Sequence, residues 1–307
     1  MTISSVELNS AYEYCQRLAR HHYENFPVAS LLLPKRLRQP ISVIYAFART
    51  ADDIADEGDA SDQQRLQALT DYQQQLVAIE QGLYQGQSPV FIALNDVIAR
   101  YQLPIQLFYD LLSAFTQDVS QQRYQTDADI LDYCRRSANP VGRLLLHLDS
   151  ETSQQQLEQS DAICTALQLI NFYQDIKQDL LENDRLYIPL DELIQAGLTE
   201  YDLNAADTTR MATIFREKYL FMHTLLLENI SLGESVGGRL GWEIRTMILA
   251  GLMTLKKLSV QKDDNLTARP RLSKSILFSA SLAALWPPVY RQSCHVMLKQ
   301  VIKYNAR

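Results

Sequence analysis

The chain has 307 residues, of which 47% are hydrophobic and 21% charged, so it can bury the core of an ordinary globular protein. Its net charge of −7 excludes a general nucleic-acid-binding protein, which needs a concentrated basic surface. It contains only 10 glycines and 10 prolines, and no stretch alternates convincingly with period two. We therefore predict an all-α fold. Because no repeat or flexible linker divides the sequence, we expect one domain over residues 1–307.

Helical periodicity covers most of the chain in order. A first helix starts near Ser5, and the stretch ENFPVAS ends it. A second helix begins near Pro40 and ends near Gly58. Apolar residues three and four positions apart predict further helices at 62–82, 89–101, 104–119, 127–136, 140–149, 153–182, 190–196, 207–232, 238–259 and 272–285.

The stretch ILFSASLAALWPPV, residues 276–289, is too short to span a bilayer. We expect a buried C-terminal helix there, with a peripheral membrane contact as the alternative. The four cysteines form no C-x-x-C pair, which is typical of reduced thiols in a cytosolic protein. The first residues lack the pattern of a secretory signal. The expected location is therefore the cytoplasm, with the inner membrane face as the alternative.

The stretch YAFARTADDIADEGD places acidic residues directly after an apolar run. At about 100° per residue, Arg49, Asp52 and Asp56 fall within about 40° of Tyr45, on the apolar stripe of the helix. Asp53 falls nearer the flank. Burying two carboxylates beside each other is costly, and one arginine cannot neutralise both. A divalent cation could.

A second acidic stretch, QLINFYQDIKQD, has the same property. Gln168, Asn171, Asp175 and Asp179 form one stripe about 80° wide on an otherwise apolar helix. Carboxylates suit Mg²⁺, which shares its remaining positions with water and substrate phosphates. Two such seams suggest a diphosphate that leaves as an anion. The alternative is two solvated helix faces with ion pairs to Arg49 or Lys177.

Four segments in this order resemble the trans-prenyl head-to-head synthases, the squalene and phytoene synthase family. They are YAFARTADDIAD, YCRRSANPVGRLLLHL, QLINFYQDIKQD and DRLYIPLDEL. The resemblance runs over roughly residues 10–275 and implies a helical bundle of the isoprenoid-synthase type with a central cavity. Three details favour the hydroxysqualene synthase branch, namely HHYENFPVAS, YAFARTADDIADEG, and NFYQDI together with NPVGRLLLHL. Gln174 stands where the family commonly has Arg, which favours a site adapted to a different step.

The resemblance implies that presqualene diphosphate and water become hydroxysqualene and diphosphate, without NADPH. It implies Mg²⁺ held by Asp52, Asp56, Asp175 and Asp179, with Asp53 in the outer shell, and partnership with other squalene-pathway enzymes. Coupling of two farnesyl diphosphates to squalene or presqualene diphosphate is the first alternative, followed by phytoene synthesis. A catalytically inactive helical interaction protein of the same fold is the alternative outside enzymes.

The remaining site residues are carried by the matching motifs. Tyr45, Arg49 and Tyr133 are the expected catalytic residues, and the expected substrate-binding residues are His22, Phe26, Gln168, Asn171, Arg185 and Tyr187. A carbocation needs a dry, aromatic cavity, and the candidates for it, with core packing as the alternative role, are Phe26, Tyr45, Phe47, Tyr133 and Phe172. For Arg269, Arg271 and Lys274 a solvated tail is favoured over a diphosphate contact. The glycine-rich residues 233–241 lack a dinucleotide-binding spacing and predict a helix-to-helix turn.

Overall fold

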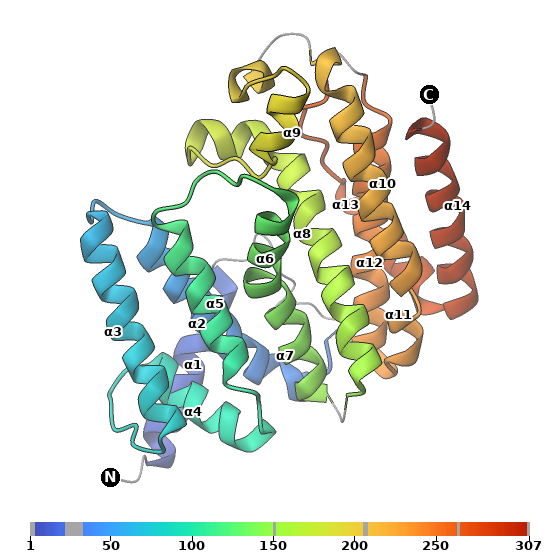
Figure 1. Ribbon diagram of the computed structural model, residues 1–307. Helices are drawn as coiled ribbons and strands as arrows, with labels where there is room; N and C mark the ends of the chain where they lie inside the picture. The colour runs from blue at the N-terminus through green and yellow to red at the C-terminus, as the bar shows by residue number, and fades with distance from the viewer. Residues whose placement is uncertain (1–3, 22–32, 150–151, 205–207, 263–264, 306–307) are drawn as a thin grey trace. The chain divides into compact units, whose positions relative to one another are not determined.

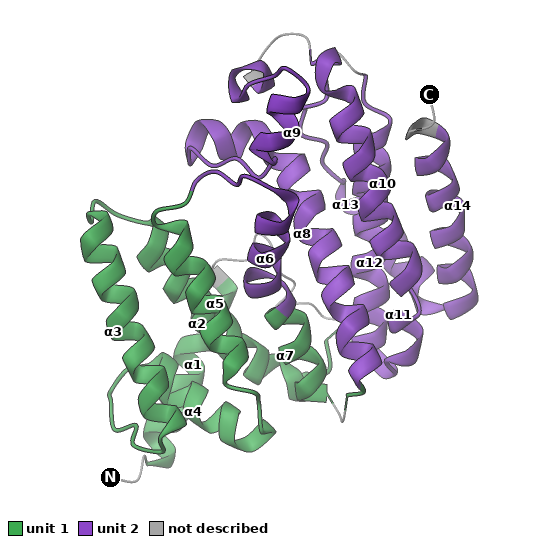
Figure 2. Cartoon of the chain, viewed as in Figure 1, with its two compact units in different colours: residues 1–121, 140–153 green, residues 122–139, 154–307 purple. Residues whose placement is uncertain are grey.

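The computed structural model describes residues 4–21, 33–149, 152–204, 208–262 and 265–305. Throughout these ranges the regular elements are helices, apart from one isolated β-bridge between Arg123 and Leu186. The prediction of an all-α fold is therefore confirmed. The chain divides into two compact units (Figure 2), unit 1 with residues 1–121 and 140–153 and unit 2 with residues 122–139 and 154–307. The single domain and the central cavity stay predictions.

Unit 1 is built around α2. Its helices are α1 (Ser5–His21), α2 (Lys35–Asp56), α3 (Asp62–Glu80), α4 (Pro89–Tyr101), α5 (Gln106–Asp118) and most of α7 (Asn139–Asp149). Helix α2 contacts α1, α3, α4 and α5. In this core the ring of Phe47 lies 5.3 Å from Tyr72, 5.8 Å from Phe91 and 5.2 Å from Phe108, measured between centroids. Phe47 thus has the packing role that was the alternative for it.

Helix α2 begins before the position that the sequence suggests. Pro40 lies inside the helix instead of at its start. Its ring removes one backbone donor, which normally weakens a helix interior. Leu37 is fully buried one turn before Ile41, so the apolar face of the helix extends back into its first turn. The burial of Leu37 offsets the hydrogen bond that is lost at Pro40.

Unit 2 is a helical bundle centred on three long helices. It contains α6 (Asp127–Ser137), α8 (Gln154–Glu182), α9 (Leu190–Gln195), α10 (Ala212–Asn229), α11 (Leu232–Ser235), α12 (Gly238–Ser259), α13 (Lys274–Leu285) and α14 (Pro287–Asn305), with 3₁₀ turns at Glu200–Asn204 and Thr209–Met211. Helices α10, α12 and α14 lie side by side (Figure 1), and α8 packs on α10 and α12. A Cβ at Gly251 would lie 2.4 Å from Leu167, so glycine permits the close approach of α12 to α8. The glycine-rich residues 233–241 form α11 and the turn into α12, as expected.

The C-terminal region departs from the sequence prediction in two ways. Helix α13 was expected to be buried, but four of its apolar side chains are exposed, namely Leu277, Phe278, Leu282 and Leu285. The prediction was wrong because an apolar helix on a surface has the same composition as one in a core. Helix α14 was not predicted; it starts with Pro287 and Pro288, and proline is favourable in the first turn of a helix. Among the described helices, none combines the length and the hydropathy required to cross a bilayer.

Candidate functional site

The acidic end of α2 gathers around one arginine. Arg49 Nη1 donates to Asp52 Oδ2 at 3.0 Å, and Arg49 Nη2 pairs with Glu57. Arg49 Nε lies 2.6 Å from Asp53 Oδ1 in an ion pair that lacks hydrogen-bond geometry. Residues three or four apart share a helix face, which explains why one guanidinium reaches several acids. Three carboxylates around one arginine leave this cluster negatively charged.

The other predicted residues of α2 lie along the same face. Tyr45 is half-buried one turn before Arg49, and burial raises the pKa of its phenol. Asp56 is exposed in the last turn of the helix. Asp53, expected on the flank, contacts Arg49 as closely as Asp52 does. The structure brings Tyr45, Arg49, Asp52 and Asp53 together and places Asp56 at the exposed end of the face.

The second acidic seam lies on α8 and is paired with an arginine from a distant loop. Arg269 Nη2 donates to Asp175 Oδ2 at 2.9 Å, its Nε pairs with Oδ1, and its Nη1 pairs with Gln178. Gln174 Nε2 donates to the carbonyl oxygen of Pro270 at 2.5 Å. The solvated tail expected at Arg269 is therefore wrong for this residue, because α8 binds both Arg269 and the residue that follows it. Arg271 is exposed.

Asp179 lies one helical turn after Asp175 and is likewise half-buried. Burial, and after it the negative charge of Asp175, raises the pKa of Asp179 to about 7, although Arg185 and Arg269 oppose this effect. The backbone N–H of Arg185 donates to the carbonyl oxygen of Asp179 at 3.0 Å and so keeps Arg185 beside the seam. A bound cation would relieve the repulsion between the two carboxylates.

An extended segment after α8 carries Tyr187 towards α6. Residues 184–191 run parallel to the segment before α6, and Leu190 N donates to the carbonyl oxygen of Tyr124 at 2.9 Å. Arg123 holds the start of the segment through an ion pair of 2.7 Å with Asp184. Asp184 has a φ of 50°, a left-handed conformation that Asp adopts more readily than most residues. This turn directs the chain away from α8 and returns Tyr187 to the bundle.

Four aromatic rings of unit 2 form one buried cluster. Tyr187 stacks on Phe172 of α8 with centroids 3.7 Å apart and planes 4° from parallel. Tyr133 of α6 lies 5.8 Å from Tyr187 and 6.2 Å from Phe172. Tyr124 completes the cluster at 5.6 Å from both Tyr133 and Tyr187. Three of these rings were candidates from sequence, and Tyr124 was missed because no periodicity marks a residue in an irregular segment.

An ion network around one buried lysine supports this region from within the unit. Lys218 of α10 is 8% exposed, contacts Glu192 Oε1 at 2.5 Å and pairs with Asp127 at the start of α6. Burial raises the pKa of Glu192, against the opposing influence of Lys218. The network joins α6, α9 and α10. It therefore fixes α6, which carries Tyr133, and α9, which follows Tyr187 in the chain. The sequence signal for it was absent, since its three charges are far apart in the chain.

The structure leaves several predicted residues without a defined role. His22 and Phe26 lie outside the described residues. Gln168 is half-buried and Asn171 exposed on α8. Over the described ranges, no three His, Cys, Asp or Glu side chains come close enough to hold a metal ion as a group. Each seam by itself therefore offers two predicted carboxylate ligands, and the metal ligands stay predictions.

The fold and these seams define the class of protein. The described residues form an all-α helical fold of the isoprenoid-synthase type, similar to that of a solved squalene synthase. The chain belongs to the squalene/phytoene synthase family, whose model matches residues 19–275. It is an enzyme family of isoprenoid biosynthesis.

Two curated relatives and one solved structure show which members of the family the chain is similar to. The chain is 40% identical over 185 residues to a hydroxysqualene synthase of Zymomonas mobilis, covering 60% of each chain. It is 37% identical over 191 residues to a hydroxysqualene synthase of Sinorhizobium fredii, covering 62% of this chain and 63% of the relative. The matched part thus spans about three fifths of these curated relatives. The crystal structure of squalene synthase HpnC from Alicyclobacillus acidocaldarius is similar with a TM-score of 0.75 and 36% identity, over 83% of this chain and 95% of that one.

Proposed function

We propose that the protein converts presqualene diphosphate and water to hydroxysqualene and diphosphate with the help of Mg²⁺. One observation carries the proposal. The acidic seam of α8 and the cluster of Tyr133, Phe172 and Tyr187 lie in the same unit and share α8. Ionisation of this cyclopropylcarbinyl diphosphate needs both parts, since one stabilises the leaving anion and the other the carbon cation. The relatives named hydroxysqualene synthase support this reaction over others of the family.

The donor set fits magnesium. Asp175 and Asp179 present hard oxygen donors one turn apart, and Asp52 and Asp56 have the same spacing on α2. Magnesium bound by few carboxylates keeps waters and substrate phosphates as its other ligands. Two carboxylates on one seam can therefore be the protein's share of the ligands. When bound, Mg²⁺ would supply electrophilic stabilisation of the diphosphate. Asp53 and Glu57 would then balance Arg49 on the same face.

The chain's own residues would perform the remaining work. Arg269 and Arg185 lie at the α8 seam and would bind diphosphate oxygens while the C–O bond breaks and its electron pair leaves with the diphosphate. The ring faces of Tyr187 and Phe172 would stabilise the cation and exclude bulk water. The cation rearranges as a C–C bond of the cyclopropane opens, and one water then forms the new C–O bond and loses a proton, which gives an alcohol.

A second candidate is squalene synthesis from two farnesyl diphosphates. The similar structure from Alicyclobacillus acidocaldarius is named a squalene synthase, which favours this alternative. The two reactions differ in substrate and reductant, so product analysis separates them.

The experiment incubates the purified chain with presqualene diphosphate or farnesyl diphosphate, with and without NADPH and Mg²⁺, and identifies products by mass. We expect hydroxysqualene from presqualene diphosphate without NADPH, and none in EDTA. The Asp175→Asn variant should lose turnover with its helical content preserved, whereas Glu158→Gln on the outer surface of α8 should keep it. Product formed from farnesyl diphosphate but not from presqualene diphosphate would overturn the proposal. No product from either substrate would favour an inactive helical protein.

A further inference from the structure

The C-terminal part of the chain has the opposite charge to the rest. Residues 265–307 contain seven Lys or Arg and no Asp or Glu, in a protein whose net charge is −7. Residues 1–264 therefore carry −14. Arg269 is paired with Asp175 and Arg291 with Glu234. Arg271, Lys274, Lys299 and Lys303 are exposed, and none of them pairs with an acid among the residues that the structure describes. This segment presents a basic surface on an acidic protein.

An apolar surface lies within the same segment. We define the α13 patch as six exposed side chains, Leu277, Phe278, Leu282, Leu285, Trp286 and Val289. At about 100° per residue, Phe278, Leu282 and Leu285 fall within about 60° on one face of α13, and Lys274 lies beside them at its start. After Lys274 the helix has no charged residue. A helix facing water normally has a charged outer face, so α13 lacks the surface of a solvated helix.

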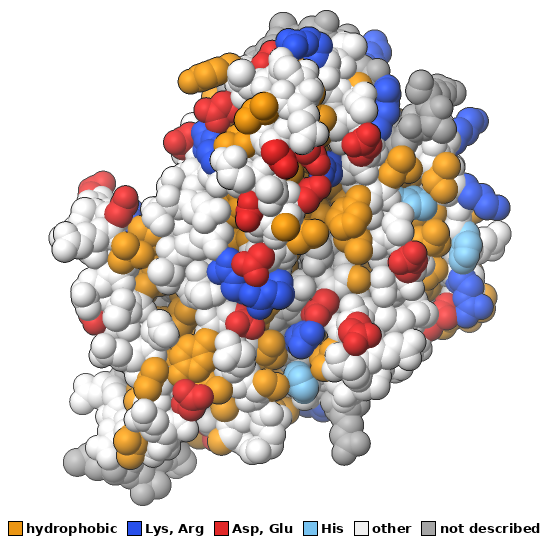
Figure 3. Space-filling model, viewed as in Figure 1, with side chains coloured by type: hydrophobic (Ala, Val, Ile, Leu, Met, Phe, Trp, Pro, Cys, Tyr) orange, Lys and Arg blue, Asp and Glu red, His pale blue; other side chains and the backbone are white. Residues whose placement is uncertain are grey.

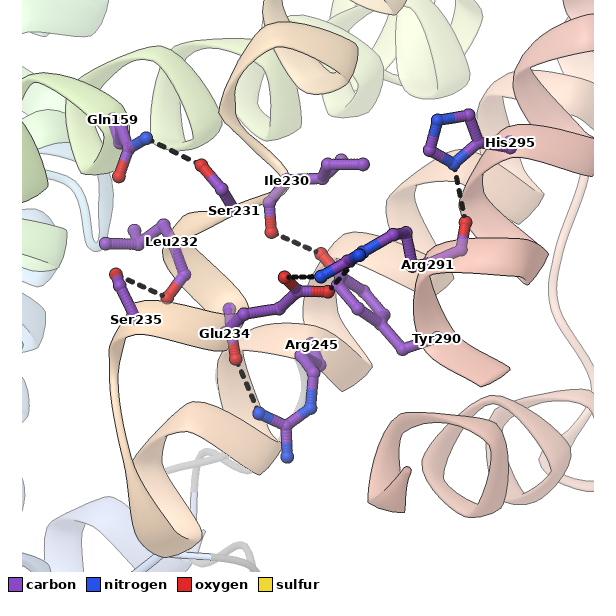
Figure 4. Close-up of polar contacts among 11 residues, drawn as sticks. Gln159, Ile230, Ser231, Leu232, Glu234, Ser235, Arg245, Tyr290, Arg291 and His295 are labelled. Carbon is purple, nitrogen blue, oxygen red and sulfur yellow. Dashed lines mark hydrogen bonds and ion pairs between the residues drawn. The ribbon is translucent and has the colours of Figure 1, made fainter. Parts of the chain in front are cut away.

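The patch is presented by a well-anchored hairpin. Arg245 is buried in α12 and donates to the carbonyl oxygens of Ala284, at 2.7 Å, and Gly233. Since Ala284 lies in the last turn of α13, Arg245 satisfies one of the carbonyls that a helix end leaves open. Figure 4 shows Arg245 and the neighbouring contacts of α14, in which Tyr290 donates to Ile230 and Arg291 pairs with Glu234. The inner side of the hairpin is thus fixed to the bundle while its outer side is apolar.

Basic and apolar side chains also lie together on the other side of α13 and on α14. An open groove of about 590 Å³ between α12, α13 and α14 has Lys256 and Lys257 beside Leu272 and Ile276. Figure 3 shows hydrophobic and basic side chains next to one another over α14, at the right edge of the view. A surface with both kinds of side chain is complementary to a partner that has an apolar layer beside a negatively charged layer.

We infer that the α13 patch docks on a bilayer containing anionic lipids. Trp286 and Phe278 would enter the boundary between headgroups and acyl chains, where aromatic side chains are enriched. Lys274 and Arg271 would face the lipid phosphates, each strengthening the attraction to an anionic leaflet. Pairing with the same patch of a second copy would bring two basic segments together without any acid to offset them. Charge complementarity therefore favours lipid over self-association.

The test measures co-sedimentation of the full chain with vesicles of phosphatidylcholine and about one third phosphatidylglycerol, compared with phosphatidylcholine alone. We expect binding to the anionic vesicles that weakens in high salt. The double variant Phe278→Ser/Trp286→Ser should lower the partition coefficient at least about tenfold, and Lys274→Gln roughly fivefold. Leu83→Ser is the matched control, because Leu83 in unit 1 is as exposed as Phe278, at 65%.

Further measurements separate docking from misfolding and self-association. Trp286→Phe should still bind vesicles but lose the blue shift of tryptophan emission that the wild type shows on binding. If the double variant misfolds by circular dichroism, Leu282→Ser and Lys274→Gln carry the test. Equal binding to neutral vesicles or unchanged binding of these variants would overturn the inference. So would a wild-type protein that is dimeric in solution and becomes monomeric when the patch is substituted.

Discussion

Arg269 binds Asp175 across 94 positions of the chain, with two guanidinium nitrogens on the two carboxylate oxygens. The contact is secured from both sides, because Gln174 binds the carbonyl oxygen of Pro270 and Gln178 takes the third guanidinium nitrogen. Consecutive turns of α8 thus hold a loop that comes from beyond α12. Gln174, which stands where the family commonly has Arg, has a structural partner of its own.

Substitution of Arg269 should impair substrate use more than folding. Under the proposed function, Arg269→Gln removes a charged donor from the diphosphate, and we expect kcat/KM to fall roughly 10- to 100-fold. Arg271→Gln, two positions on and exposed, should stay within about threefold of wild type. Steady-state kinetics with presqualene diphosphate provide the measurement. Equal losses in both variants would show that general positive charge matters and the contact with Asp175 does not.

Asp179 should make the metal-free protein less stable as pH rises through 7. Its folded-state pKa of about 7 exceeds the usual value near 4, so between these values the folded chain keeps a proton that the unfolded chain has lost. Stability is therefore greatest below this window and falls as pH rises to 8. Asp179→Asn removes the penalty and should raise the free energy of unfolding at pH 8 by about 1–2 kcal/mol, after allowance for solvent screening.

Thermal melts in EDTA at pH 5 and pH 8 check this expectation. The difference between Asp179→Asn and wild type should shrink at pH 5, whereas Glu158→Gln should show no such change between the two pH values. A difference of the same size at both pH values would mean that ionisation of Asp179 does not limit stability.

The stacked pair of Tyr187 and Phe172 offers a test of cation stabilisation. Tyr187→Phe keeps the ring and should retain most activity, while Tyr187→Leu removes the ring face and should lower kcat about 10- to 30-fold. Melting temperatures must be recorded alongside, because loss of a buried ring also destabilises the core. Similar kcat values for the two variants would assign Tyr187 to packing alone.

Helical periodicity was sufficient to predict the local seams. Asp175 and Asp179 are four apart on one helix, so a period of 3.6 residues places them on one face without any tertiary information. Tyr133, Phe172 and Tyr187 belong to different elements, and only resemblance to a family brought them together before the structure did. Arg269 and Arg271 have the same local context, so nothing in the sequence distinguished the paired residue from the exposed one.

The exposure of α13 could not be predicted for a related reason. Hydropathy measures how apolar a helix is, and Phe278 or Leu282 would have the same value in a core or on a surface. The charge of residues 265–307 was the available signal, but it describes a whole segment and not one face. Similarly, α13 ends at Leu285 and α14 begins at Pro287, and a proline in the sequence does not show whether a helix follows it.

Removal of the Lys218 ammonium group should destabilise unit 2. Lys218→Met fills much of the same volume but leaves Asp127 and Glu192 without their shared cation, so we expect a loss of about 3 kcal/mol in the free energy of unfolding. Denaturant titration provides the measurement, with the exposed Lys303→Met as a control that should change stability by less than about 0.5 kcal/mol.

Further variants at the Lys218 network distinguish the effect of charge pairing on stability from the effect of packing. If the unpaired acids cause the loss, adding Asp127→Asn and Glu192→Gln to Lys218→Met should recover part of it, because neutral side chains cost less to leave without a cation. No recovery would mean that the lysine stem packs in a way that methionine does not reproduce. Because the network fixes α6 and α9 beside the aromatic cluster, recovery of stability should bring back turnover in parallel.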